Sequence, residues 1–313
     1  MKILYEIPDG RKIFSNPVIT IGTFDGVHAG HKEIFRTLLK IAREKSADPV
    51  VLTFDSHPRK IINPATPPRI LTTKQEKIRA IGESGIPNII VLKFTKEIAD
   101  IHPADFLNSI ILKKIGSEHL VLGYDHAFGK DRLGDYAFLS EISREKRLEI
   151  TRVDPLDYHS KPVSSTWIRA EIEDGNISLA NKLLGRKYSL FGKVVKGFGR
   201  GAKLGFQTAN ILPEDPDKII PKDGVYAVGV VIDNTLKKGG MINIGANPTF
   251  DNTERSIEVN IFDFNDNIYD RTLEIDFYER IRDEVKFDSA EALAEQIKND
   301  RVAAKALMKN NGF

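Results

Sequence analysis

The 313-residue chain contains no cysteine, so it cannot form a disulfide, a thiolate–zinc site, an iron–sulfur ligand set or a cysteine nucleophile. It also has little excess charge of either sign, because 46 Lys and Arg stand against 44 Asp and Glu and leave a formal net charge of +2. No long block of like charge occurs along the chain. The electrostatic footprint of a nucleic-acid-binding protein is therefore missing.

Long apolar runs are also absent. No window approaches the ~18 consecutive apolar residues of a membrane span, and Glu6 and Asp9 stand where a signal peptide requires apolar residues. We therefore expect a cytoplasmic protein without nucleic-acid or membrane partners, and the sequence leaves open a transient homo-oligomer. With roughly 150 residues per domain, the length predicts about two domains.

The first part of the chain alternates short β-branched runs with amphipathic stretches. This alternation predicts an α/β domain with a parallel, Rossmann-like sheet covered by helices. In such an open sheet, ligands bind beyond the carboxyl ends of the strands, so the segments that follow strands become candidate sites. The predicted strands are 18–22, 50–54, 88–94, 119–123 and 149–153, and the predicted helices are 30–47, 73–84, 103–115, 135–147, 164–174 and 178–184.

The pattern changes at Gly185-Arg186-Lys187, where we place a boundary between domains 1–186 and 187–313. The second part consists of strand-like runs separated by Gly, Pro, Asn and Asp clusters, and it ends in one long amphipathic stretch. A small antiparallel β-barrel with a terminal helix fits this order. The predicted strands are 189–196, 224–232, 239–245, 256–264 and 272–277, and the predicted helix is 289–308.

The segment 22–31, Gly-Thr-Phe-Asp-Gly-Val-His-Ala-Gly-His, joins a predicted strand to a predicted helix. Its glycines allow close backbone approach, the helix N-terminus offers free N–H groups, and His28 and His31 can donate to phosphate oxygens. An isolated His-x-x-His is more often a surface pair or an incidental metal site, but these surroundings favour a polyphosphate site. A His-Glu-x-x-His metalloprotease is excluded, because residue 29 is Ala.

A second candidate, Val-Ser-Ser-Thr-Trp-Ile-Arg at 163–169, opens a predicted helix. Its hydroxyl residues can be an ordinary N-cap. However, Arg169 near the first turn is opposed by the helix dipole unless an anion lies nearby, which favours a second phosphate clamp. The loops 54–58 and 123–134 also follow strands, although turn chemistry alone can account for both.

In the second domain, a glycine-rich loop at 197–205 matches neither the Rossmann nor the Walker spacing, and a flexible hairpin is the alternative. Thr208 and Asn210, two apart in an extended segment, point the same way and carry oxygens that suit Mg²⁺. Glu258 lies opposite the apolar face of strand 256–264. It is either a solvated strand carboxylate or, beside a ligand pocket, a general base.

Four ordered motifs in the first domain resemble the adenylyltransferase module of prokaryotic bifunctional FAD synthetases: Gly-x-Phe-Asp-Gly-x-His-x-Gly-His, Phe-Asp-x-His-Pro, Gly-x-Asp-x-x-Phe-Gly and Ser-Ser-Thr-x-Ile-Arg. The resemblance implies in-line transfer of AMP from ATP to FMN, with release of pyrophosphate and no covalent enzyme intermediate. One departure is His126-Ala127, where an aromatic–Arg pair is common. The implied roles are phosphate contacts at the transition state for His28 and His31; pyrophosphate binding for Ser164, Ser165, Thr166 and Arg169; nucleotide and metal surroundings for Thr23, Asp25 and Asp125; further ATP contacts for Phe24, Gly26 and Gly30; and flavin contacts for His57 and Pro58.

The second domain resembles the riboflavin kinase module of the same enzymes through the glycine-rich loop, Gly-Phe-x-Thr-Ala-Asn, Pro-Lys-Asp-Gly-Val-Tyr, Ile-Gly-Ala-Asn-Pro-Thr and Ile257-Glu258-Val259. This implies phosphorylation of riboflavin by MgATP, with Glu258 as base and Arg282 near the flavin phosphate. Gln207 replaces the usual proline before Thr208, so presentation of Thr208 becomes looser. Two alternatives remain, namely one retained activity or a non-catalytic flavin-binding regulator. The implied ATP contacts are Gly197, Gly199, Lys203, Thr208 and Asn210, the last two also binding metal.

Overall fold

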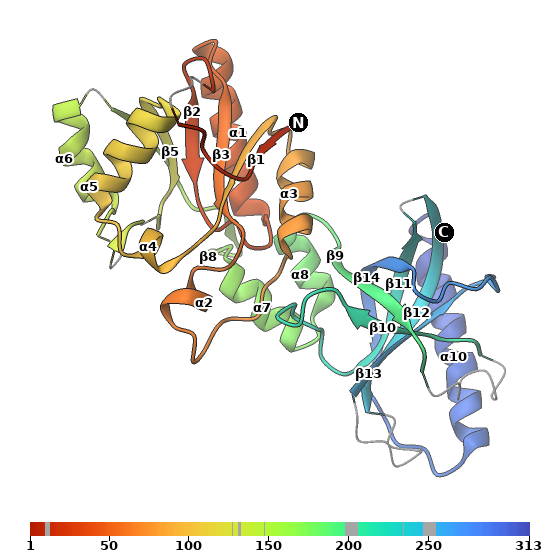
Figure 1. The fold of residues 1–313 in the computed structure, drawn as a ribbon. Coiled ribbons are helices and arrows are strands. Elements are labelled where there is room, and N and C mark those ends of the chain that lie inside the picture. The colour runs from red at the N-terminus through yellow and green to blue at the C-terminus, as the bar shows by residue number, and fades with distance from the viewer. Residues whose placement is uncertain are drawn as a thin grey trace. The chain divides into compact units, whose positions relative to one another are not determined.

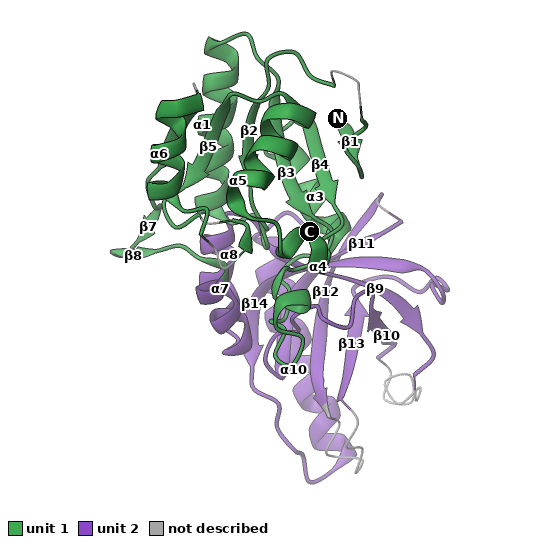
Figure 2. Ribbon diagram, turned by 60° about the vertical axis from the view of Figure 1, so that its left-hand side comes forward, with its two compact units in different colours: residues 1–165 green, residues 166–313 purple. Residues whose placement is uncertain are grey.

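The computed structural model describes residues 1–9, 13–126, 128–130, 133–146, 148–197, 206–233, 235–246 and 255–313. The chain forms two compact units, Met1–Ser165 and Thr166–Phe313, which Figure 2 colours separately. The first unit contains a parallel sheet with helices and the second contains a closed β-barrel with a terminal helix. Both predicted fold classes are thereby confirmed.

The sheet of the first unit has six strands in the order β1-β4-β3-β2-β5-β6, and every neighbouring pair is parallel (Figure 1). The β-branched runs form its buried central strands, as expected for a sheet covered on both faces. The sequence prediction missed β1, because three partly exposed residues carry too little pattern. The strands are β1 Lys2–Leu4, β2 Val18–Ile21, β3 Pro49–Phe54, β4 Asn88–Leu92, β5 His119–Gly123 and β6 Glu149–Val153.

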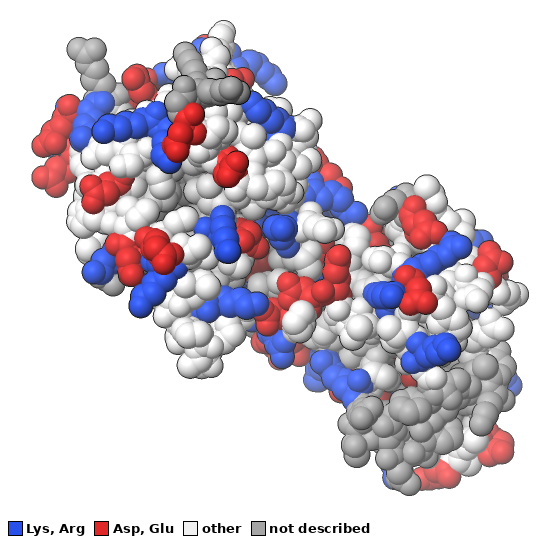
Figure 3. All heavy atoms as spheres, viewed as in Figure 1, with Lys and Arg blue, Asp and Glu red and all other residues white. Residues whose placement is uncertain are grey.

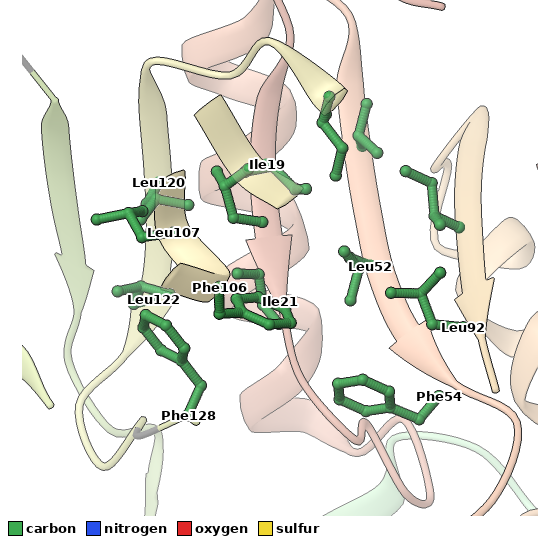
Figure 4. Close-up of a cluster of buried hydrophobic side chains, with 14 of the residues drawn as sticks. Ile19, Ile21, Leu52, Phe54, Leu92, Phe106, Leu107, Leu120, Leu122 and Phe128 are labelled. Atoms are coloured by element: carbon green, nitrogen blue, oxygen red, sulfur yellow. The ribbon is translucent and has the colours of Figure 1, made fainter. Parts of the chain in front are cut away.

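Side chains along each strand alternate between two hydrophobic clusters. Ile19 and Ile21 enter a cluster that contains Phe106 and Leu107, whereas Val18 enters another that contains Phe35. Figure 4 shows the first cluster over β2, β3 and β5. The helices are α1 Ala29–Glu44, α2 Arg59–Ile62, α3 Lys74–Glu83, α4 Lys96–Ala99, α5 Pro103–Asp105, the π-helix η1 Phe106–Ile115 and α6 Tyr136–Lys146, and a small hairpin pairs β7 Asp157–Tyr158 with β8 Lys161–Pro162.

The strand order locates the ligand crevice of the first unit. After β2 the chain proceeds to β3 and β4 on one side of β2, and then returns to β5 and β6 on its other side. An open α/β sheet binds its ligand beyond the carboxyl ends of the strands at this switch point. The segments that follow β2 and β5 therefore border the crevice, and the segment that follows β3 lies beside them.

The barrel of the second unit closes in the order β10-β13-β12-β11-β14-β9, with antiparallel pairs throughout. Helix α10, Ala290–Lys309, packs on β11, β12 and β14, with Ala304 and Met308 fully buried. The short strand β10 was expected only as an extended segment. The strands are β9 Tyr188–Val195, β10 Ala209–Pro213, β11 Gly224–Ile232, β12 Leu236–Ala246, β13 Arg255–Ile261 and β14 Thr272–Arg282.

Two helices precede the barrel, α7 Ser165–Glu173 and α8 Ile177–Leu184, and α8 packs on it. Buried Asn181 of α8 donates from Nδ2 to the carbonyl of Phe277 at 2.9 Å and accepts from the amide of Tyr188 at 2.6 Å. The compact units therefore divide between Ser165 and Thr166, after the first residue of α7 and before α8. The functional boundary at 186/187 stays a prediction.

Acidic and basic side chains are interspersed over the face of the molecule in Figure 3, in keeping with the net charge of +2. Among the described helices, none has both the length and the apolar composition that crossing a membrane requires.

Candidate active sites

The first site is built on the turn between β2 and α1. Its backbone has positive φ at Phe24 (49°), Gly26 (83°) and Val27 (42°), an arrangement that few non-glycine residues adopt. The ring of Phe24 lies against Gly22, where a Cβ would come within 2.7 Å of that ring. The positive φ angles and the packing of Phe24 on Gly22 form a tight turn that leads from β2 to the start of α1.

His28 is the N-cap of α1, and its Nδ1 accepts a hydrogen bond from the amide of His31 at 3.3 Å. With Nδ1 as acceptor, the neutral ring carries its proton on Nε2. The rings of His28 and His31 stack with centroids 3.6 Å apart and an interplanar angle of 19°. Gly30 makes room for this pair, because a Cβ there would lie 3.2 Å from the His28 ring.

Burial, followed by the neighbouring His28 and Lys77, lowers the pKa of His31 well below its ordinary value. The stacked pair is therefore not doubly charged at neutral pH. Nδ1 of His31 is buried and has no hydrogen-bond partner among the described residues. Together with the N–H groups of a first helical turn that contains no acidic residue, the pair forms a compact site for phosphate oxygens.

Asp25 supports this turn from inside the protein. Its carboxylate is 5% exposed and accepts hydrogen bonds from the amides of Leu71 (3.0 and 3.1 Å) and Thr72 (3.0 Å). The Thr72 hydroxyl lies 3.1 Å from the same carboxylate and accepts from the amide of Gly26 at 2.9 Å. Asp25 therefore fixes the turn between β2 and α1, a positioning contribution that the sequence motif did not reveal.

The second motif meets this turn through Ser165, whose hydroxyl donates to the backbone carbonyl of Asp25 at 2.8 Å. The carbonyl of Val163 lies beside Gly30, 3.5 Å from where a Cβ would stand. Ser164 lies between these two contacts. Thr166 and Arg169 lie on α7 in the second unit, and Arg169 begins the second helical turn rather than standing in the first.

The remaining predicted residues of the first site lie in the segments that follow β2, β3 and β5. His57 and Pro58 come after β3, where Nδ1 of His57 accepts from the amide of Arg59 at 3.2 Å and Pro58 is the N-cap of α2. Asp125 is exposed just beyond β5. The backbone carbonyl of Thr23 accepts from the hydroxyl of Thr53 at 3.2 Å, which ties the turn after β2 to β3.

The second site lies on β10 and β13 of the barrel. The antiparallel register places Asn210 opposite Glu258, and the hydroxyl of Thr208 donates to Oε2 of Glu258 at 3.1 Å. The other carboxylate oxygen, Oε1, is 3.3 Å from the hydroxyl of Ser256. The alternation along β13 is as expected, because Ile257, Val259 and Ile261 are buried on the opposite face. Sequence reasoning did not single out Ser256.

Gly197 lies against this group, because a Cβ there would come 1.9 Å from Nδ2 of Asn210. A side chain at 197 would therefore displace the Asn210 amide. Gly199 and Lys203 of the glycine-rich loop lie outside the described residues, as do Ala127 and residues 247–249.

Comparisons with known proteins identify a family for each part of the chain. The FAD synthetase family model matches residues 11–167, and the riboflavin kinase family model matches residues 184–308. A protein from Buchnera aphidicola subsp. Schizaphis graminum, named bifunctional riboflavin kinase/FMN adenylyltransferase, is 36% identical over 96% of both chains. The chain belongs to this bifunctional family.

Two further relatives extend the match. A Bacillus subtilis protein of the same name is 35% identical, covering 92% of this chain and 91% of its own. A crystal structure described as a macrolide-efflux protein from Streptococcus pneumoniae superposes with a TM-score of 0.86 at 33% identity, covering 97% of this chain and 99% of that one. The overall architecture is therefore shared with a solved structure.

Asn260 is a residue of the kinase module that sequence reasoning missed. Its side chain is 5% exposed, and Nδ2 donates to the backbone carbonyl of Gln207 at 2.6 Å. This bond fixes the peptide unit that joins Gln207 to Thr208. Because this buried hydrogen bond restricts the backbone just before Thr208, it supplies part of the rigidity that a proline at position 207 would give. The one sequence feature that indicates a role for Asn260 is its position two residues after Glu258, on the same polar face of the strand.

We expect Asn260→Ala to lower the kinase rate about tenfold and to raise the Mg²⁺ concentration needed for half-maximal rate, because about 1–3 kcal/mol of buried hydrogen bonding is lost beside Thr208. Adenylyl transfer by the same molecules should not change. Steady-state assays of both reactions across a Mg²⁺ titration test this. An unchanged Mg²⁺ dependence in the folded variant would show that Asn260 does not position Thr208.

Arg282, which the sequence predicts near the flavin phosphate, has its guanidinium hydrogen-bonded within the second unit. Nε donates to both carboxylate oxygens of Asp300 at 3.0 Å, and one terminal nitrogen donates to Asp300 at 2.8 Å. The other terminal nitrogen of Arg282 donates to the carbonyl of Asp283 at 2.8 Å. Asp300 is 3% exposed and also accepts from Gln296 at 2.8 Å. Arg282 therefore ties α10 to the end of β14.

Arg282→Leu should lower the free energy of unfolding of the second unit by about 3–5 kcal/mol, because it leaves the buried Asp300 carboxylate without its partner. The double variant with Asp300→Leu should be clearly more stable than the single one. Trp167, the only tryptophan, lies in the second unit and reports urea unfolding by fluorescence. Additive losses in the double variant would contradict a direct pair.

Proposed function

We propose that the two activities of this family reside in two separate centres, one at the turn between β2 and α1 and one on the barrel strands β10 and β13. FMN adenylylation takes place at the His28–His31 pair, and riboflavin phosphorylation takes place at Glu258, Thr208 and Asn210. The supporting observation is that each polar group is organised by contacts inside its own unit: Asp25 is bonded to residues 71–72, and Glu258 is bonded to Thr208. The hydrogen bonds of Asp25 and the bond between Thr208 and Glu258 each join residues of the same unit.

In the adenylylation, a phosphate oxygen of FMN attacks the α-phosphorus of ATP. The new P–O bond forms in line with the breaking bond to the β-phosphate, and pyrophosphate leaves without a covalent enzyme intermediate. His28, through its Nε2 proton, His31 and the first amides of α1 stabilise the charge that develops on the α-phosphate oxygens. Ser164, Ser165, Thr166 and Arg169 hold the departing pyrophosphate.

Other residues of the first centre bind and orient the two substrates. Thr23, Phe24, Gly26, Gly30 and Asp125 border the nucleotide at the carboxyl ends of β2 and β5. His57 and Pro58, which follow β3, contact the flavin. Positioning the two substrates for in-line attack supplies a large part of the rate enhancement in reactions that need no covalent intermediate.

In the kinase reaction, the ribityl 5′-hydroxyl attacks the γ-phosphorus of ATP, the bond from that phosphorus to the β-phosphate oxygen breaks, and ADP leaves. Glu258 takes up the hydroxyl proton. The hydrogen bonds from Thr208 and Ser256 orient this carboxylate before substrate arrives. Gly197, Gly199 and Lys203 contact the ATP phosphates.

Mg²⁺ fits the second centre. Thr208 and Asn210 offer neutral oxygens of the kind that a hard cation binds. Among the described residues no group of three His, Asp or Glu side chains could enclose a metal by itself, so the remaining ligands would be phosphate oxygens and water. When bound, the ion neutralises charge on the transferring phosphate.

The ligands are accordingly riboflavin, FMN, FAD, ATP and Mg²⁺. The cytoplasmic location, the absence of nucleic-acid and membrane partners, and a transient homo-oligomer remain predictions from the sequence. The balanced surface charge in Figure 3 is compatible with substrates that are small anions rather than nucleic acids.

Label transfer tests the proposal. With riboflavin and ATP labelled on the γ-phosphate, label should enter FMN first and FAD later. With ATP labelled on the α-phosphate, label should enter FAD alone. Entry of α-label into FMN, or failure of γ-label to reach FMN, would contradict the assigned chemistry.

A further inference from the structure

Lys77 belongs to none of the motifs, yet it is among the most buried charged residues of the first unit. It lies on α3, whose start is fixed by a capping box between Thr73 and Glu76, and it is 5% exposed. Burying an ammonium group is strongly unfavourable unless its protons find acceptors. The acceptors of Lys77 therefore indicate why a lysine occupies this position.

Nζ of Lys77 donates to the carbonyl of Phe54 at 2.6 Å and to the carbonyl of Thr23 at 3.1 Å. Phe54 ends β3, and Thr23 follows its neighbour β2. From these two points the chain continues into loop 22–28, which ends at the N-cap His28, and loop 54–58, which contains His57. One ammonium thus joins the bases of the two loops assigned to phosphate and flavin.

Loop 22–28 needs such support because its backbone is strained. Val27 is β-branched and has φ of 42°, and Phe24 has φ of 49°. Conformations of this kind cost about 1–3 kcal/mol each and persist only where the surroundings hold them. Asp25 anchors the loop by accepting hydrogen bonds from the amides of residues 71 and 72. Lys77 anchors it by donating a hydrogen bond to the carbonyl of Thr23.

The titratable groups that interact with Lys77 lie in loop 22–28, in loop 54–58 and on α1. Burial lowers its pKa to about 8, against the opposing effect of Asp25 and Asp55. Lys77 in turn acts with burial and His28 to lower the pKa of His31 on α1. Near pH 7 the lysine is therefore mostly charged while His31 is neutral, since a nearby cation disfavours a second one.

We propose that Lys77 is a positioning residue for adenylyl transfer: its ammonium fixes loops 22–28 and 54–58 relative to each other and places a positive charge close to the His28–His31 pair. The proposal rests on the function assigned to that pair. Stability alone does not require the charge, because an apolar side chain of similar volume is often as stable in a buried position as an ion.

Lys77→Met in the full chain is the first test, with Lys74→Met as the matched control. Lys74 lies in the same helix but is exposed. Lys77→Met should lower kcat/KM for FAD formation from FMN by about 10²-fold, because misplacing substrates by a fraction of an ångström to an ångström has effects of that size. Lys74→Met should have no effect, and neither variant should change the kinase rate.

A histidine titration by NMR separates positioning from a general structural loss. In Lys77→Met the pKa of His31 should rise, because a cation beside it is gone. His119 serves as the fold marker of the same unit: it lies at the amino end of β5, with Nε2 2.9 Å from the hydroxyl of Thr151. Its titration should not change.

Lys77→Gln, which is neutral but keeps two N–H donors, is the second variant should the Met variant fail to fold. It should show the same rise in the pKa of His31 with a smaller loss of rate. An unchanged His31 titration in a folded variant, or rate losses equal to those of Lys74→Met, would overturn the proposal. If the wild-type chain forms no FAD, the assigned function fails instead, and the titration still tests the contact of Lys77 with the pair.

Discussion

Glu258→Gln should abolish riboflavin phosphorylation while leaving FAD formation from added FMN intact. The amide is nearly isosteric and still accepts the hydrogen bond that Thr208 donates at 3.1 Å, but it cannot take up the proton of the ribityl hydroxyl. Removing a general base lowers the rate about 10²–10⁴-fold. The loss should fall on kcat, because the binding surface is unchanged.

The matched control is Glu279→Gln, an exposed glutamate on β14 of the same barrel. Initial rates of FMN formation, with FAD formation measured on the same preparation, make the comparison. Retention of a tenth or more of the wild-type kinase rate would show that another group accepts the proton, and loss of both activities would contradict separate centres.

His28→Asn should have the opposite effect, removing adenylyl transfer and sparing the kinase. Asparagine is also a good N-cap, so it keeps an acceptor for the amide of His31 and preserves the start of α1. The imidazole N–H is lost, and deletion of one such donor to a developing charge lowers the rate about 10²–10³-fold. The double variant with His31→Gln should be lower still.

His159→Asn is the control for that pair of variants. His159 lies in the exposed turn between β7 and β8 with φ of 49°, a conformation that asparagine adopts readily. Both activities of this control should match the wild type. A normal adenylyl-transfer rate in His28→Asn would show that the stacked pair does not act on the phosphates.

The order of the elements could be predicted from the sequence because it depends on local patterns. The β-branched runs and the apolar spacing of 30–47 predict β2 to β6 and α1 to within a few residues, and the motif glycines predict the turn beside them. Strand β1 and helices α2 and α4 were missed, since three or four residues carry too little periodicity.

Long-range partners were not predictable in the same way. The partners of an arginine or a carboxylate depend on residues far along the chain, so the bond between Arg282 and Asp300 was not predicted, and the contact of Arg282 with the flavin phosphate stays a prediction. For the same reason the roles of Lys77 and Asn260 were not foreseen, because their acceptors are backbone carbonyls 54 and 53 positions away. Backbone acceptors leave no mark in a sequence motif.

The central claim, two independent centres in one chain, is tested most directly by mixing purified variants. Glu258→Gln alone should not consume riboflavin, and His28→Asn with His31→Gln alone should stop at FMN. Combined in one tube with riboflavin, ATP and Mg²⁺, they should produce FAD, because FMN released by one protein is the substrate of the other. No FAD from the mixture, when each variant keeps its own remaining activity, would contradict the account.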